Sequence, residues 1–340
     1  MSRFKGDLAF SKKTPKTGVL LTNLGTPDAP TAPALRRYLA EFLSDPRVVE
    51  ISRLIWMVIL HGIILRIRPA KSAKLYDSIW TEEGSPLLAI TQKQRDAVAA
   101  QLHKSYGDDV VVDIAMRYGN PSIPSRLKAM QEQGINNIIV LPLYPQYASP
   151  TTGSTFDAIA KEVGTWRWVP SISFISSYHD NPLYIRALRK SIEEHFAEHG
   201  KPEKLVFSYH GMPKRFHNLG DPYFDFCHKT TEIVTKRLGL KEDEYILTFQ
   251  SRFGNAEWLK PYTDETLESL AKAGTKHIAI VSPAFSADCL ETLEELEEEN
   301  REIFEEAGGE SYHYIPCLNA REDHIDAIVS LITPYLKNTQ

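Results

Sequence analysis

Apolar runs of strand length recur along the chain, and three of them recur in the same order. The first run in each set is followed by Gly-X-Pro. The second run ends in Arg, an aromatic residue, Gly and Asn, and the third run lies between a Gly and a Pro. The paired segments are 19–27 and 204–213, 111–120 and 245–255, and 134–142 and 274–283. This pattern predicts a duplicated unit built on buried strands.

Segments with apolar residues at helical spacing separate these strands. They cover residues 34–42, 91–103, 182–199, 230–238 and, as a closing helix, 323–336. The alternation of strands and helices predicts an α/β fold with parallel sheets and right-handed crossovers. A length of 340 residues suits two domains, which we expect at 1–173 and 174–340.

The first copy of the unit is longer than the second between its first two strands, and the surplus includes the strongly apolar segment Leu54–Leu65. Arg53, Arg66 and Arg68 flank this segment. It falls short of the about 20 residues that a transmembrane helix needs. Two interpretations stay open, a buried core helix or an exposed apolar flap that touches a greasy ligand or a membrane surface.

Composition narrows the class of protein. A formal net charge of -5 argues against nucleic acid as a partner. Three widely spaced cysteines without a C-x-x-C motif suggest neither a disulfide framework nor a local metal clip. Residues 1–7 lack the apolar core of a signal peptide, so a reducing cytoplasm is the expected compartment. A nucleotide-binding function is disfavoured because no glycine-rich phosphate loop follows a strand.

His210 is the first candidate for chemistry. It ends an apolar strand, and Gly211 and Pro213 then turn the chain away, so the imidazole is expected at the carboxyl edge of a parallel sheet. The first copy of the unit has Leu24 at the matching position. A neutral imidazole can bind a metal ion or accept a proton near pH 7.

A row of carboxylates follows the third strand of the second copy. Glu291, Glu295 and Glu299 recur at i, i+4 and i+8, opposite a leucine stripe, as on one face of an α-helix. Ser286 or Asp288 is expected to cap this helix. A solvated face is the simplest interpretation, but a cation that moves along the row would relieve the repulsion between like charges.

Several motifs in one order resemble those of the ferrochelatase family. They are Leu20–Pro27, Gly84–Leu87, Leu141–Tyr147, Phe207–Pro213, Phe249–Gly254 and Ser286–Leu293. The resemblance runs from about Gly18 to Ile332. It implies insertion of Fe(II) into protoporphyrin IX to give protohaem with release of two protons, the last step of haem biosynthesis. It also implies two similar Rossmann-like domains with the active-site cleft between them.

The resemblance assigns roles to individual residues. His210 matches the residue that binds metal or accepts a pyrrole proton, and Glu291 matches the carboxylate paired with it; Glu295 and Glu299 match an acidic row that leads outward. The positions that match substrate-binding residues, including the lip over the porphyrin, are Leu24, Arg117, Tyr118, Trp258, Ile55, Trp56 and Ile59. Cys289 stands where some members carry histidine, and its role stays open.

The resemblance also bears on cofactors and partners. Animal members carry a C-terminal cysteine cluster for an iron–sulfur centre, and this sequence has none, so we expect no such cluster and no permanently bound cofactor. The expected partners are protoporphyrin IX and ferrous iron, with peripheral contact between the flap and the inner membrane surface. Two rival functions remain: a chelatase for cobalt, nickel or coproporphyrin, and a porphyrin-binding protein without catalysis.

Overall fold

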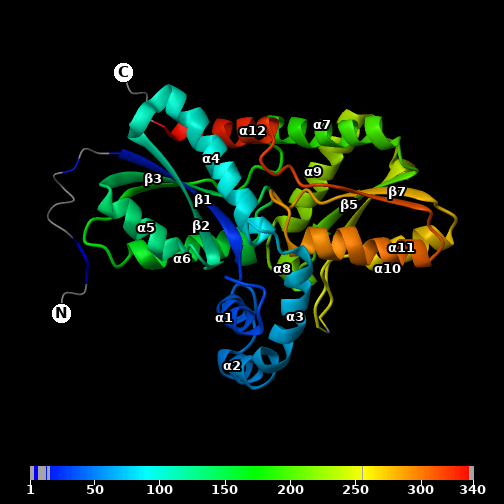
Figure 1. The fold of residues 1–340 in the computed structure, drawn as a ribbon, viewed down its shortest axis with the longest axis horizontal. Coiled ribbons are helices and arrows are strands. Elements are labelled where there is room, and N and C mark those ends of the chain that lie inside the picture. The colour runs from blue at the N-terminus through cyan, green and yellow to red at the C-terminus, as the bar shows by residue number, and fades with distance from the viewer. Residues whose placement is uncertain (1–3, 7–12, 14–15, 255, 337–340) are drawn as a thin grey trace. The chain divides into compact units, whose positions relative to one another are not determined.

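The computed structural model describes residues 4–6, 13, 16–254 and 256–336. It contains two four-stranded parallel sheets with helices on both faces, which confirms the predicted fold class (Figure 1). Much of the N-terminal segment, for which the sequence predicted no signal peptide, lies outside the described residues, as does Asn255 at the end of the second strand motif.

The chain forms two compact units. One holds the described part of residues 1–144, 149–177 and 328–340, and the other holds residues 145–148 and the described part of 178–327. The strand order is β2-β1-β3-β4 in the first sheet and β6-β5-β7-β8 in the second. The three predicted pairs of strands therefore occupy equivalent places in the two sheets, with β1 and β5 both flanked on each side.

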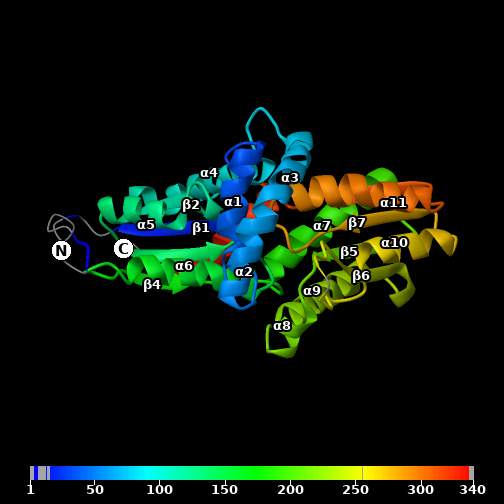
Figure 2. The same ribbon diagram turned by 90° about the horizontal axis from the view of Figure 1, so that it is seen from below.

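The first unit contains strands and helices in near alternation. Its elements are β1 (Lys16–Thr26), α1 (Ala32–Leu43), α2 (Arg53–Ile59), α3 (Leu65–Ile79), α4 (Pro86–Tyr106), β2 (Val110–Gly119), α5 (Ile123–Glu132), β3 (Ile135–Pro142), α6 (Ser154–Val163) and β4 (Ser171–Phe174). Helices α5 and α6 pack on one face of the sheet, where Leu20, Leu127 and Ile159 belong to one buried cluster, and α4 covers the other face (Figures 1 and 2). Residues 19–23 of β1 are all buried because both faces are covered.

The second unit repeats this plan. Its elements are α7 (Pro182–His199), β5 (Lys204–His210), α8 (Lys214–Asn218), α9 (Tyr223–Leu238), β6 (Tyr245–Gln250), α10 (Thr263–Lys272), β7 (His277–Val281), the π-helix η6 (Glu291–Glu299), α11 (Asn300–Glu306) and β8 (Ser311–Ile315). Leu267 of α10 and Phe304 of α11 pack with Val206 on one face of the sheet. The closing helix α12 (Glu322–Ile332) begins in this unit and ends in the first.

The apolar segment of the first unit is an exposed flap and not a core helix. Helix α2, the π-helix η2 (Leu60–Ile64) and the start of α3 form it. Leu54, Ile55 and Val58 are 83%, 59% and 73% exposed. Trp56 is buried instead, and its Nε1 donates a hydrogen bond of 2.6 Å to the Leu43 carbonyl. Among the described residues, the structure holds no helix of the length and apolar character that a membrane span requires.

Candidate active site

His210 is the last residue of β5, and its side chain is partly buried. Its Nδ1 lies 2.7 Å from the Gly211 carbonyl oxygen. A carbonyl can only accept, so Nδ1 carries a proton, and in the neutral form of the ring the lone pair is on Nε2. His210 is therefore held in the tautomer whose Nε2 can accept a proton or bind a metal ion.

Two glycines fix the ends of the central strands. A Cβ on Gly211 would lie 2.6 Å from the Gln250 carbonyl oxygen and 3.0 Å from the Trp258 ring. In the first unit, Gly25 has φ +113°, and a Cβ there would lie 1.8 Å from the Tyr118 carbonyl oxygen. Only glycine permits such close approach between adjacent strands. The glycine in each Gly-X-Pro motif thus serves the scaffold in both units.

Trp258 lies beside the loop that follows His210. It forms an isolated antiparallel bridge with Pro213, and Leu259 donates a backbone hydrogen bond of 2.9 Å to Met212. Its ring is partly buried against the site where a Gly211 side chain would lie. The sequence-predicted aromatic residue is therefore close to the His210 turn.

Glu295 is hydrogen-bonded to the end of β6, where Gln250 pairs with His210. It accepts hydrogen bonds from the Ser251 backbone N–H at 2.7 Å, from the Ser251 hydroxyl and from Gln250 Nε2 at 3.2 Å. Burial raises the pKa of Glu295, and the Ser251 hydrogen bond and the charge of His210 oppose that rise. Glu295 and His210 therefore interact electrostatically.

These hydrogen bonds also explain where β6 ends. The sequence pattern predicted a strand that continues to the Arg-aromatic-Gly motif, as β2 does. Strand β6 instead stops at Gln250, because Ser251 turns to φ 61° and gives its N–H to Glu295. The second copy of the motif lies in a loop that presents Ser251 to the carboxylate.

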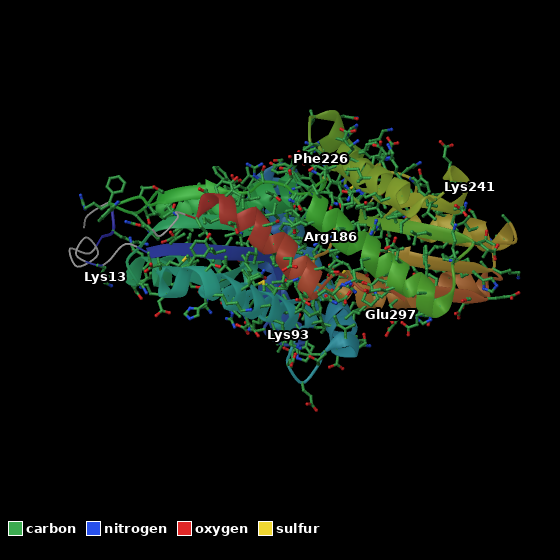
Figure 3. The ribbon with its side chains drawn as sticks, turned by 90° about the horizontal axis from the view of Figure 1, so that it is seen from above. Lys13, Lys93, Arg186, Phe226, Lys241 and Glu297 are labelled. Carbon is green, nitrogen blue, oxygen red and sulfur yellow. The ribbon has the colours of Figure 1, made fainter. Side chains whose placement is uncertain are left out.

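The carboxylate row lies on a π-helix, which corrects the predicted α-helix. Hydrogen bonds from i to i+5 widen each turn, and such helices concentrate at functional sites. Glu291 and Glu295 are partly buried, whereas Glu299 is exposed, so the row leads from the interior of the unit to its surface. Glu297, labelled in Figure 3, belongs to the same helix and is partly buried.

Glu294 is a functional candidate that the sequence reasoning missed. Its pKa is raised to about 7, mainly by burial. The charges of Glu299, Glu295, Glu298 and Glu291 raise it further. The i, i+4 spacing expected for an α-helix excluded it from the row. The high density of glutamates in this segment is the sequence feature that could have identified Glu294.

Asp288 anchors the start of the π-helix. Its carboxylate accepts hydrogen bonds from the Tyr314 hydroxyl at 2.6 Å, from Asn319 Nδ2 at 2.6 Å and from the Cys317 backbone N–H at 3.2 Å. It also accepts one from the Thr292 hydroxyl at 3.2 Å, whereas the helix start itself has no side-chain hydrogen bond to a cap. Asp288 therefore joins the helix to the loop after β8 and does not cap it as predicted.

Cys289 lies next to the first glutamate of the row. Burial raises the pKa of its thiol well above the usual value, and the charge and a side-chain hydrogen bond of Glu291 raise it further. The thiol therefore stays protonated at neutral pH. A protonated thiol is uncharged, so Cys289 adds no second negative charge beside Glu291.

The predicted substrate residues of the first unit belong to a buried polar network. Arg117 Nη2 lies 2.5 Å from Asp45 Oδ2, and the Tyr118 hydroxyl donates to the same oxygen at 2.9 Å. Arg117 Nε donates to the Ser154 hydroxyl at 2.6 Å. Burial works to raise the pKa of Asp45, but hydrogen bonds from the Ser154 hydroxyl, the Arg47 backbone N–H and the Tyr118 hydroxyl, with the charge of Arg117, bring it below its usual value. The sequence reasoning missed Asp45 and Ser154.

The remaining predicted residues of the first unit differ in exposure. Leu24 is partly buried near the end of β1, the place that His210 occupies in β5. Tyr118 is fully buried. On the flap, Ile55 is exposed and Ile59 is partly buried, whereas Trp56 faces α1.

Comparisons with known proteins identify the family to which the chain is similar. A family model described as Ferrochelatase matches residues 16–336. The chain is 61% identical to Ferrochelatase 2 of Shewanella oneidensis over 94% of its own length and 98% of that protein. It is 58% identical to a ferrochelatase of Marinobacter nauticus over 95% of its own length and 87% of that protein.

Solved structures of low sequence identity share the fold. SirB from Bacillus subtilis with Fe3+ superposes with a TM-score of 0.54 at 14% identity, over 95% of this chain and 97% of that chain. CbiX, the terminal enzyme for biosynthesis of siroheme in denitrifying bacteria, gives a TM-score of 0.51 at 11% identity, over 94% and 100% of the two chains. At this identity the likeness concerns the fold alone.

Proposed function

The chain belongs to the ferrochelatase family and inserts ferrous iron into a porphyrin for haem synthesis, and on this basis we propose that His210 and Glu291 exchange two pyrrole protons for the metal ion. The observation that carries the proposal is the hydrogen bond between His210 Nδ1 and the Gly211 carbonyl. It directs the free lone pair of the ring to Nε2, where a proton can be accepted.

His210 takes the first proton in this proposal. One porphyrin N–H gives its proton to Nε2, and the ring becomes an imidazolium; the second N–H gives its proton to Glu291 as that carboxylate releases the ion. Glu295 interacts with that positive charge and is itself held by Ser251 and Gln250. A carboxylate fixed beside the base stabilises its protonated form, which is what a general base requires.

Metal delivery is the task of the glutamates. Fe(II) is a substrate, and carboxylate oxygens on a π-helix give it successive ligands from the surface inward. Glu299 is exposed and receives the ion, Glu295 lies between, and Glu291 is the last carboxylate before the porphyrin. Cys289 remains a protonated thiol beside Glu291, so it adds no competing negative charge at neutral pH.

Protoporphyrin IX is the proposed porphyrin. The flap exposes Leu54, Ile55 and Val58, which suit apolar vinyl edges better than extra propionates. We place Leu24, Arg117, Tyr118 and Trp258 at the substrate, with Ile55 and Ile59 on the lip. Trp56 supports the lip from within, since it is buried against the Leu43 carbonyl.

The same flap supports the proposed setting of the enzyme. An amphipathic segment that is too short to span a bilayer can lie on the membrane interface. Arg53, Arg66 and Arg68 flank it and suit anionic headgroups. We place the enzyme in the cytoplasm, with the flap in peripheral contact with the inner membrane surface.

An anaerobic assay with Fe(II) and protoporphyrin IX tests the proposal. The free-base absorption spectrum should convert to that of the metalloporphyrin in the wild type and stay unchanged in His210→Ala. A folded protein that binds porphyrin without metallation would be a binding protein instead. Preferred turnover of Co(II), Ni(II) or coproporphyrin would assign one of the rival chelatase activities.

A further inference from the structure

Three histidines of the second unit gather at a place that the insertion chemistry does not use. His195 and His199 come from α7, and His313 comes from β8. One nitrogen of each ring lies within 4.8 Å of the other two. The ring centroids are 4.5 Å apart for His195 and His199, and 4.6 Å apart for His199 and His313.

Regular secondary structure brings these rings together. Residues four apart share one face of a helix, so His195 and His199 project side by side from α7. Side chains alternate along β8, where Tyr312 and Tyr314 belong to the core cluster on one face. His313 therefore points to the opposite face of the sheet, where α7 packs.

One buried ring nitrogen of this cluster has no protein partner in the described part of the chain. This nitrogen is Nε2 of His195. A buried imidazole nitrogen without a hydrogen-bond partner keeps its lone pair available to a metal ion.

We propose that His195, His199 and His313 bind a divalent transition-metal ion of the zinc, cobalt and nickel class. Three imidazole nitrogens suit such borderline ions, whereas magnesium and calcium select oxygen ligands. A tetrahedral site with bonds of about 2.0–2.1 Å needs ligand nitrogens closer than the separation seen here. His199 is exposed, so its ring can turn toward the other two, and water can fill the fourth position.

The site is separate from the one that inserts iron. A helix between parallel strands runs antiparallel to them, so the C-terminal end of α7 lies near the amino ends of the strands. Arg186 marks the first half of this helix in Figure 3. His210 and the glutamate row lie instead at the carboxyl ends of β5 and β7. A bound ion would therefore link α7 to the edge strand β8 and would stabilise the unit without entering the reaction.

Titration of the full-length protein with Co(II), in the absence of porphyrin, tests this site. His210→Ala serves as the background, because it removes the imidazole of the insertion site. We expect one equivalent of Co(II) with visible absorption of imidazole-bound tetrahedral cobalt, and a rise of the melting temperature with Zn(II). Adding His199→Gln, which alters an exposed ring, should weaken Co(II) binding by roughly tenfold or more.

Two further variants make the test decisive. His195→Gln/His313→Gln in the same background should abolish the cobalt spectrum and the Zn(II) stabilisation, with far-UV circular dichroism as the check on folding. His103→Gln, which changes an exposed histidine of the first unit, should leave both intact. An unchanged spectrum and stoichiometry in His199→Gln and in the folded double variant would overturn the proposal.

Discussion

Glu294 and Glu299 lie five residues apart on the π-helix η6, and the charge of Glu299 raises the pKa of Glu294 more than that of any other neighbour. In an α-helix, residues five apart point about 140° away from each other. The i to i+5 pattern brings them onto one face. The π-helix therefore concentrates negative charge along the path on which we place the incoming cation.

Glu294 makes the stability of the protein depend on pH. Its folded-state pKa of about 7 lies above the usual glutamate pKa of 4.5, so folding favours the protonated form. The resulting penalty is absent below pH 4.5 and grows until about pH 7, where both states are ionised. Because Glu294 is partly exposed, we expect Glu294→Gln to stabilise the protein at pH 8 by only about 1 kcal/mol.

Urea unfolding at pH 5 and pH 8 measures this effect. The gain in unfolding free energy for Glu294→Gln should be larger at pH 8 than at pH 5. Glu305→Gln, a change of an exposed glutamate on α11, serves as the control and should show no such difference. An equal gain at both pH values would mean that Glu294 titrates normally.

His210→Ala should stop iron insertion while the protein stays folded. Loss of a general base costs about 10²–10⁴ in rate. The side chain is only partly buried, so its removal leaves the core intact. Anaerobic kcat with Fe(II) and protoporphyrin IX measures the loss, and circular dichroism checks the fold. Turnover like that of the wild type would remove His210 from the mechanism.

The glutamates should differ in the kinetic constant that each controls. Glu291→Gln should lower kcat strongly, because Glu291 is the last carboxylate before the porphyrin. Glu299→Gln should raise the KM for Fe(II) and leave kcat nearly unchanged, because this exposed residue acts at capture. Steady-state kinetics with varied Fe(II) separates the two effects. Equal losses in the two variants would contradict a delivery order.

The sequence predicts the scaffold well because its signals are local. Apolar runs that are followed by Gly-X-Pro identify the two central strands, β1 and β5. His210 is the residue that ends the second of these runs. The spacing of the glutamates predicts a helix, but it does not distinguish an α-helix from a π-helix. The hydrogen bonds from Ser251 to Glu295 depend on how two distant segments meet.

Other parts of the site depend on contacts between distant residues. Asp45 and Arg117 are 72 positions apart, and neither segment indicates that the two side chains meet. The apolar run of the flap does not show which side faces inward, so Trp56 could not be recognised as its anchor. His195 and His199 suggest one helix face, but only the order of the strands brings His313 to it.

The purified protein should show no iron–sulfur chromophore. Cys227, Cys289 and Cys317 are all buried, and such clusters usually need four cysteine ligands. Burial also raises the pKa of each thiol well above its usual value, which disfavours the thiolate that binds iron. Visible absorption and acid-labile sulfide in anaerobically prepared protein measure this. Stoichiometric sulfide would contradict the prediction.

Selectivity for the porphyrin should depend on Ile55 and Ile59, the two flap residues that we place on the lip. Ile55→Ser with Ile59→Ser should lower kcat/KM for protoporphyrin IX more than for coproporphyrin, because coproporphyrin has propionates in place of vinyl groups. An unpaired carboxylate against apolar side chains costs several kcal/mol, on the order of a hundredfold or more in selectivity. The same change should reduce binding to anionic liposomes, since apolar area drives such binding.

A change of the buried residue Trp56 is the control for the two serine substitutions. Its ring is 5% exposed and donates to the Leu43 carbonyl, so Trp56→Phe should lower the melting temperature and leave the preference between the two porphyrins nearly unchanged. Competition between protoporphyrin IX and coproporphyrin in one assay gives the ratio of kcat/KM directly. If the serine variant kept the wild-type ratio, or if the wild type preferred coproporphyrin, Ile55 and Ile59 would not select the substrate.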